Sequence, residues 1–302
     1  MKKIVYIDRI SHKVEEEKVY GEKYIHFLYG KKVFRKVAHF LAAWIGLSIF
    51  YGWIQKSFLS RKKIIPFIQK FHINTEEFLD SVDSFSSFNH FFIRKLKTTA
   101  RPIIPGDKVA VLPADARYLV YPDLSAIEGI WVKGNKLSLE ELLGPYADAR
   151  RYAEGSLVIA RLAPVDYHRF HFPVDCTPSP SFCMGKLLHS VNPQALKENI
   201  RILSSNKRAL SILKNSLWGD ILYIEVGALF VGAIHQTYEP GKRYTKGEEK
   251  GFFSFGGSTL LLLFEPGKIL FSSDLVQASS QGIEVLGKMG QILGVYKENI
   301  SG

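Results

Sequence analysis

The chain has 302 residues, of which 46% are hydrophobic and 13% aromatic, so it can bury a large core and is not expected to be disordered. Its formal net charge of +11 lies at one end: residues 1–70 hold 15 Lys and Arg against 5 Asp and Glu, which leaves only +1 for the remainder. The two cysteines, Cys176 and Cys183, are too few for a disulfide framework and favour a reducing, cytosolic setting.

The N-terminal segment begins with short alternating runs in residues 1–30, which predict strands or a hairpin. The longest apolar run follows, Val37–Ile54, and as a helix it would reach about 27 Å, which is marginal for a bilayer core. Cations stand on both sides of it: Lys31, Lys32, Arg35, Lys36, Lys56, Arg61, Lys62 and Lys63.

Basic residues on both sides of the apolar run suit a helix that lies on one leaflet, so a monotopic anchor on an anionic membrane surface is favoured over a true span. A buried core helix is the remaining structural alternative. A nucleic-acid site is disfavoured, because the charge brackets an apolar stretch instead of being dispersed over a groove. We therefore expect a peripheral or monotopic protein on the cytoplasmic side of the cell membrane.

Downstream, residues 61–97 have helical spacing, with Ile65, Ile68, Phe71, Phe78 and Leu79 as apolar positions and Asn74 or Thr75 as a cap. Beyond Pro102 short β-rich runs alternate with Gly and Pro, interrupted by one predicted helix at Ser138–Leu143 whose Ser138 and Glu141 have capping-box spacing. Glu225 lies in an otherwise apolar strand, where a paired or edge-facing carboxylate is expected.

These patterns predict an α+β fold: a β-rich catalytic domain with an N-terminal helical membrane-associating segment. The expected domains are residues 1–85, with strands and membrane-associating helices, and residues 86–302, which form the catalytic domain.

Three short motifs contain residue types that can take part in catalysis. Gly256-Gly257-Ser258-Thr259 lies between two β-like runs and by itself is typical of a turn. It does not match the hydrolase elbow G-x-S-x-G, because Leu260 replaces the last glycine. A glycine before a serine does, however, leave the peptide carbonyl open to attack by the serine hydroxyl.

The second motif, DYHRFHFP at residues 166–173, holds His168 and His171, and Pro173 favours a strand or loop in which the two side chains point to opposite sides. A histidine is the usual base for a serine hydroxyl near neutral pH. Zinc ligation together with Cys176 is disfavoured, because no further ligand has a usual spacing. The third motif, LPADAR at residues 112–117, places Asp115 between apolar strands, where a simple Asp turn is the plain alternative.

Residues 246–269, KGEEKGFFSFGGSTLLLLFEPGKI, resemble the processing-site region of phosphatidylserine decarboxylases. Over residues 85–302 the resemblance continues, in the family's order, through FNHFFIRKLK (88–97), PADAR (113–117), DYHRFHFP (166–173), SVNP (190–193) and VGALFVGAI (226–234). Two positions depart from the family pattern, Ala116 where many members have Gly and Gly256 where many have Leu.

The resemblance implies that Asp115, His171 and Ser258 form a self-cleavage triad and that His168 assists decarboxylation. It implies cleavage between Gly257 and Ser258 into a β chain of residues 1–257 and an α chain of residues 258–302, which remain together as a heterodimer. Ser258 would become a pyruvoyl group, the covalent cofactor, which forms a Schiff base with phosphatidylserine and releases CO2 and phosphatidylethanolamine. No metal or other cofactor is expected.

Two rival interpretations remain open from the residues alone. One is an uncleaved serine hydrolase that uses Asp115, His171 and Ser258. The other is a non-catalytic membrane-docking domain in which the Gly-Ser pair is only a turn.

Overall fold

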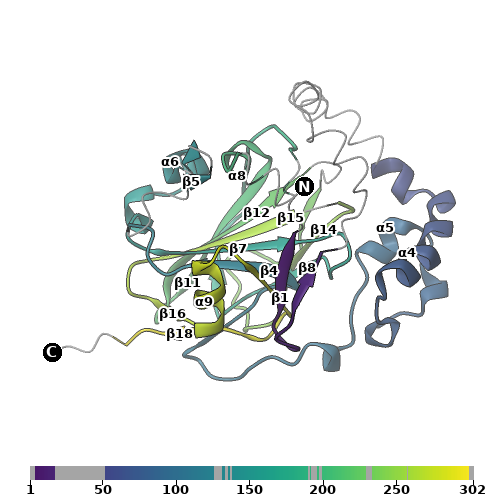
Figure 1. Ribbon diagram of the computed structural model, residues 1–302. Helices are drawn as coiled ribbons and strands as arrows, with labels where there is room; N and C mark the ends of the chain where they lie inside the picture. Colours follow the sequence, from purple (N-terminus) through teal and green to yellow (C-terminus); the bar gives the residue numbers. More distant parts are fainter. Residues whose placement is uncertain are drawn as a thin grey trace.

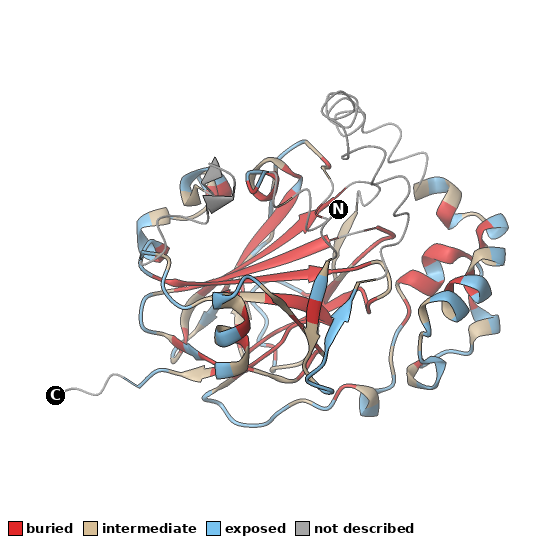
Figure 2. Ribbon diagram, viewed as in Figure 1, coloured by how far each residue is buried: buried red, intermediate tan, exposed pale blue. Residues whose placement is uncertain are grey.

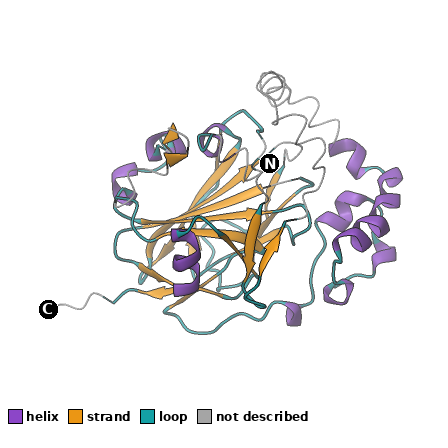
Figure 3. Ribbon diagram, in the orientation of Figure 1, coloured by secondary structure: helices purple, strands orange, loops and turns teal. Residues whose placement is uncertain are grey.

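The computed structural model describes residues 4–17, 52–125, 131–132, 135–136, 138–189, 191, 196, 199–228, 233–256 and 258–298. Within these residues, strands predominate over short helices, as Figure 3 shows, so the predicted α+β class is confirmed. The apolar run Val37–Ile54 lies outside the described residues except for its last three positions. Among the helices in the described part of the chain, none is both long and apolar enough to cross a membrane.

A ten-stranded sheet forms the centre of the molecule, in the order β10-β11-β12-β15-β7-β4-β17-β1-β2, with β9 beside β11 (Figure 1). Its strands are β1 Val5–Asp8, β2 Val14–Glu16, β4 Ala116–Tyr121, β7 Ser156–Leu162, β9 Thr177–Pro178, β10 Phe182–Met184, β11 Arg208–Asn215, β12 Gly219–Gly227, β15 Ser258–Phe264 and β17 Glu284–Gly287.

Strand β15 lies between β12 and β7, antiparallel to both, and every one of its residues is buried (Figure 2). Its sequence, STLLLLF, is apolar on both faces because both faces of the sheet are covered. Leu260 and Leu262 belong to one core cluster, and Leu261 and Leu263 belong to another. A strand with two covered faces is a rigid site for a reactive residue.

Three smaller sheets complete the β structure: β13-β14-β8, β16-β18-β3 and β5-β6. Their strands are β3 Val109–Val111, β5 Trp131–Val132, β6 Asn135–Lys136, β8 Arg169–His171, β13 Ile234–Gln236, β14 Glu249–Phe253, β16 Ile269–Phe271 and β18 Ile292–Tyr296. Phe170 of β8 and Phe253 of β14 share a core cluster with Leu260 and Leu262, so the β13-β14-β8 sheet packs on that face of β15.

The helices and 3-10 turns around α4 and α5 gather to one side of the strands (Figure 1). They are η1 Phe58–Lys63, α4 Ile64–Phe71, η2 Thr75–Glu77, η3 Val82–Ser84 and α5 Phe88–Phe92, followed by η4 Thr98–Ala100. Asn74 caps η2 by accepting a hydrogen bond from the Glu76 amide, as the sequence predicts. Ile65 and Leu79, predicted with the apolar face, are 50% and 56% exposed, because Ile64 and Phe67 turn towards the core instead.

The remaining helices are α6 Leu139–Leu143, η5 Ala149–Tyr152, α8 Ile202–Ser205 and α9 Ser273–Ser280. The predicted helix at Ser138–Leu143 is confirmed: the Ser138 hydroxyl caps α6 by accepting a hydrogen bond from the Glu141 amide.

The N-terminal strands belong to the large sheet, although the predicted domain boundary assigns them to residues 1–85. Strand β1 pairs in parallel with β17 and antiparallel with β2. Glu17, next to β2, forms ion pairs with Arg161 at 2.5 Å and Arg117 at 3.4 Å. A truncation that removes residues 4–17 would therefore disturb the catalytic body as well as the segment after it.

Glu225 is paired, as expected for an acid in an apolar strand. Its Oε1 lies 2.5 Å from Nζ of Lys250, and both side chains are fully buried. Lys250 stands at a β-bulge of β14, and the bulge turns its side chain towards the core, where the ammonium lies 4.8 Å from the ring centroid of Tyr223. Burial raises the pKa of Glu225 and lowers that of Lys250, so this pair joins the β13-β14-β8 sheet to the large sheet at a cost in desolvation.

Candidate active site

Ser258 is the first residue of β15, where it stands opposite Leu162 of β7 and Gly227 of β12. Its side chain is 0% exposed, and among the described residues its Oγ has no hydrogen-bond partner. Because alternate residues of a strand share a face, Ser258 points to the same side as Leu260, towards the β13-β14-β8 sheet. A buried hydroxyl without a partner is costly in a folded protein, which makes it a candidate reactive group.

The segment before Ser258 is tied to the helical side of the molecule. The Phe255 amide donates to Oδ1 of Asn89 at 3.0 Å, and the Phe255 ring packs at 4.9 Å from that of Phe92. Gly256 has a φ of 135°, a conformation that a side chain would strain. Gly256, where many members of the family have Leu, therefore has a backbone conformation that a leucine would strain, while Gly257 lies outside the described residues.

His168 is buried beside the end of β7. Its Nε2 donates to the Ala163 carbonyl at 3.0 Å, and Ala163 directly follows Leu162, the residue opposite Ser258. The imidazole stacks on Phe92 with centroids 3.9 Å apart. Its Nδ1 has no hydrogen-bond partner in the described part of the chain. Burial lowers the pKa of His168 to about 3, so the ring is neutral at pH 7 with a lone pair on Nδ1.

His171 is the last residue of β8. Its Nδ1 donates to the Gly247 carbonyl at 3.0 Å, which leaves the lone pair on Nε2, and no described residue bonds to Nε2. Burial lowers the pKa of His171, so this imidazole is also neutral at pH 7. A neutral, oriented imidazole with a free nitrogen has the state that a general base requires.

The Asp115 carboxylate is buried and held by cations. Nη2 of Arg101 lies 2.6 Å from its Oδ2, Nζ of Lys288 lies 3.4 Å away, and the Met289 amide donates to Oδ1 at 2.9 Å. Burial by itself would raise the pKa of Asp115, but Lys288 and Arg101 outweigh it and lower that pKa. Asp115 is therefore ionised at pH 7.

The structure brings Asp115 and His171 together through the backbone, because the His171 amide donates to the carbonyl of Pro113 at 2.8 Å. No hydrogen bond links the side chains of Asp115, His171 and Ser258 to one another among the described residues. The carbonyl of Gly247 occupies the position behind His171 where the sequence interpretation puts Asp115.

The two histidines lie towards different ends of β14. The Phe253 amide, at the end that leads to Ser258, donates to the His168 carbonyl at 3.0 Å, whereas His171 stands opposite Glu249 at the other end. Because β8 and β14 are antiparallel, His168 contacts residues close to Ser258, whereas His171 contacts Gly247 and Pro113.

Sequence reasoning missed several residues that build the site. Arg101 neutralises Asp115, Phe92 stacks on His168 and Asn89 holds the Phe255 amide. Phe92 and Asn89 lie in the motif FNHFFIRKLK, which contributed to the family resemblance. The motif does not, however, show which residues these two side chains contact. In the described part of the chain, no cluster of His, Cys, Asp and Glu could hold a metal ion.

The fold and the site define an α+β enzyme with a buried serine at the start of a central strand and two buried neutral histidines at or next to β8, in the sheet that packs on that strand. The phosphatidylserine decarboxylase family model matches residues 88–294, and the chain belongs to this family.

Similar proteins from Chlamydia species cover almost the whole chain. Those from Chlamydia felis and Chlamydia pneumoniae are 49% and 47% identical over 294 residues, which are 97% of this chain and 98% of each relative. One from Chlamydia muridarum is 45% identical over 290 residues, 96% of both chains. All three are named phosphatidylserine decarboxylase proenzyme.

Proposed function

We propose that this chain cleaves its own backbone between Gly257 and Ser258 and converts Ser258 into a pyruvoyl group. As a member of the phosphatidylserine decarboxylase family, the enzyme decarboxylates phosphatidylserine to phosphatidylethanolamine. The observation that supports self-cleavage is the buried Ser258 hydroxyl, which has no partner and faces the sheet that bears the histidines. The rival uncleaved hydrolase would need the same three residues but no chain break.

The cleavage begins when Oγ of Ser258 attacks the Gly257 carbonyl carbon while Nε2 of His171 accepts the hydroxyl proton. The peptide C–N bond breaks, its nitrogen takes that proton, and an ester replaces the amide. Removal of the Ser258 α-proton then expels Gly257 as a carboxylate and leaves dehydroalanine with a free amine. Tautomerisation and addition of water release ammonia, and a pyruvoyl group remains as the first group of the α chain.

The residues present fit this group, because Ser258 has a buried, unpaired hydroxyl in an otherwise apolar strand. When formed, the group would bind the substrate amine as a Schiff base and supply a sink for the electron pair that CO2 leaves on the substrate carbon. His168 is proposed to take up at Nδ1 the proton that the substrate ammonium loses and to pass it to the substrate carbon in place of CO2. Its Nε2 is held by the Ala163 carbonyl, so Nδ1 is the nitrogen available for proton transfer.

Both products of cleavage would stay together. The α chain begins with β15, whose seven residues pair with β12 on one side and β7 on the other. Because β15 is buried between two strands of the β chain, we propose that the mature enzyme is a heterodimer of its own two chains.

The wild-type protein is expected to give two chains under denaturing conditions, one ending at Gly257 and one beginning with a pyruvoyl group. Intact mass spectrometry measures both masses directly. Ser258→Ala is the matched control and should remain a single chain, because it lacks the attacking oxygen. A single intact species of 34.2 kDa that is nevertheless active would contradict self-cleavage and favour the hydrolase.

We also propose that the protein associates with the cytoplasmic membrane surface through Val37–Ile54 and the residues next to it. Phe58 and Leu59 are 69% and 76% exposed, and the adjoining Lys56 and Lys62 are exposed cations. Exposed apolar side chains beside cations suit the interface of an anionic bilayer.

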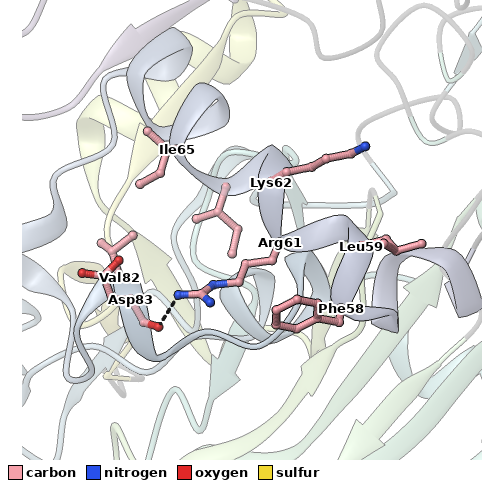
Figure 4. Close-up of a pocket in the computed structure, with 8 residues that line it drawn as sticks. Phe58, Leu59, Arg61, Lys62, Ile65, Val82 and Asp83 are labelled. Carbon is pink, nitrogen blue, oxygen red and sulfur yellow. Dashed lines mark hydrogen bonds between the residues drawn. The ribbon is translucent and has the colours of Figure 1, made fainter.

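A surface pocket of about 460 Å³ lies in this region (Figure 4). Its lining consists of Phe58, Leu59, Arg61, Lys62, Ile64, Ile65, Val82 and Asp83. Arg61 crosses the pocket and donates to the Asp83 carbonyl at 2.9 Å, which holds η1 against η3. The pocket thus combines apolar walls with two cations, which supports contact with phospholipid.

The double variant Lys56→Gln/Lys62→Gln is expected to bind anionic phospholipid vesicles roughly 10- to 30-fold more weakly, because each cation near such a surface contributes about 1 kcal/mol. Vesicle sedimentation at fixed ionic strength measures this. Lys242→Gln/Arg243→Gln removes the same charge from exposed positions of the catalytic body and should bind as the wild type does. Equal losses in both double variants would show only an effect of net charge and would contradict this membrane surface.

A further inference from the structure

Arg94 is a buried arginine with incomplete hydrogen bonding. It follows α5, and its side chain is only 5% exposed. Its guanidinium donates to the carbonyls of Phe91, Val165 and Asp166, each at 3.4 Å, which is the outer limit for such a bond. Its Nε has no hydrogen-bond partner among the residues that the structure describes.

Other buried arginines in the described residues have closer partners, although Nε of Arg117 also lacks a hydrogen bond and lies 3.4 Å from Oε2 of Glu17. Four form ion pairs of 2.8 Å or less with a carboxylate: Arg101 with Asp115, Arg117 with Asp166, Arg161 with Glu284 and Arg169 with Glu249. Arg208 has no carboxylate, but it donates to the carbonyls of Leu142, Glu141, Asn206 and Ser204. Within the described part of the chain, Arg94 is thus set apart as a buried cation with capacity for an additional anion.

The position of Arg94 is next to the candidate active site. The loop that accepts its hydrogen bonds, at Val165 and Asp166, continues directly to His168. Phe92, two residues before Arg94, stacks on the His168 ring. The charge on Arg94 contributes to the lowered pKa of His168, after burial, so the two groups interact electrostatically.

Arg94 stays charged in this position. Burial lowers its pKa, but only to about 10. The rings of Phe78 and Phe91 lie 5.0 and 4.9 Å from the guanidinium and hold it by cation–π contact. An immobilised guanidinium is suited to bidentate binding of a phosphate or carboxylate.

We propose that Arg94 binds the phosphodiester of the phosphatidylserine head group, an inference that rests on the proposed chemistry at Ser258. The head group offers two anions, a phosphodiester and the carboxylate that leaves as CO2. An ion pair with the leaving carboxylate would stabilise the ground state and oppose its loss, whereas the phosphodiester keeps its charge throughout. The phosphorus is three bonds from the carbon that loses CO2, so it must lie close to His168.

The test uses three soluble amines and measures, by mass after borohydride reduction, how much of each is trapped on the α chain. Glycerophosphoserine carries both anions, glycerophosphoethanolamine only the phosphodiester and L-serine only the carboxylate. Arg94→Gln is expected to raise the half-saturating concentration of the two phosphodiester probes roughly 10- to 100-fold, since it removes a charged hydrogen-bond donor. Trapping of L-serine should not change.

Arg208→Gln is the matched control, because it removes another buried arginine that lacks a carboxylate. It is expected to lower the unfolding midpoint without changing the preference among the three probes. Equal losses for L-serine and the phosphodiester probes in Arg94→Gln would overturn the inference, and so would a normal response to all three.

Arg94→Lys keeps the charge but loses the bidentate geometry, so its half-saturating concentrations should be intermediate. Failure of both Arg94 variants to cleave would assign Arg94 to folding or self-cleavage and would also overturn the inference. If the wild type itself traps none of the three probes, the pyruvoyl proposal fails first and the inference about Arg94 falls with it.

Discussion

His171→Ala and Asp115→Asn should each leave a single uncleaved chain. His171 is neutral and its Nε2 is free, so it is proposed to accept the Ser258 proton, and alanine removes that base. Asp115 is proposed to support His171 electrostatically, and the pKa of His171 responds to its charge. Asparagine keeps the size of Asp115, whereas alanine would also remove the closest carboxylate partner of the buried Arg101 and leave it paired only with Glu77.

The measurement is the ratio of cleaved to uncleaved chain after purification, with a loss of at least 100-fold in cleavage rate expected for removal of a general base. His90→Ala is the control, because His90 lies in α5 but is exposed. If His171→Ala cleaves normally while His168→Ala does not, the two roles are reversed. His168 contacts Ala163 and Phe253, which are both close to Ser258, so His168 is the rival candidate for the base of self-cleavage. The experiment must distinguish between the two histidines.

His168→Ala should still give two chains and still trap the substrate amine on reduction, yet form little phosphatidylethanolamine. His168 is proposed to act only after the pyruvoyl group exists, when its Nδ1 transfers the proton that replaces CO2. Loss of a positioned proton donor costs about 10²- to 10⁴-fold in rate. Lipid turnover, chain cleavage and adduct mass are therefore measured on the same preparation.

A structural role for His168 predicts a different pattern. The ring stacks on Phe92 and bonds the Ala163 carbonyl, so a purely structural histidine would lose stability, cleavage and turnover in parallel. His168→Gln is the matched variant, because an amide can still donate to Ala163 but cannot transfer a proton near neutral pH. Turnover that survives in His168→Gln would contradict the proton-transfer role.

The sequence by itself determined the properties that depend on local pattern. The change from helical spacing to short β-rich runs near Pro102 predicted the α+β class. The sequence predicted Ser138 as one helix cap and Asn74 or Thr75 as another, and Ser138 and Asn74 are the caps in the structure. Capping involves residues two or three positions apart, so the signal lies within one turn. The order of several motifs along the chain identified the family, which the comparisons confirm.

Only the tertiary structure decided which distant groups meet. Glu225 was expected to be paired or to face an edge, and only the structure shows that it is paired, with Lys250, which is 25 positions away and is turned inward by a bulge. The Gly247 carbonyl orients His171, and Arg101 neutralises Asp115, contacts that depend on which strands lie side by side. Residue spacing records the periodicity of each strand, whereas these contacts depend on long-range packing, so no local pattern contains them.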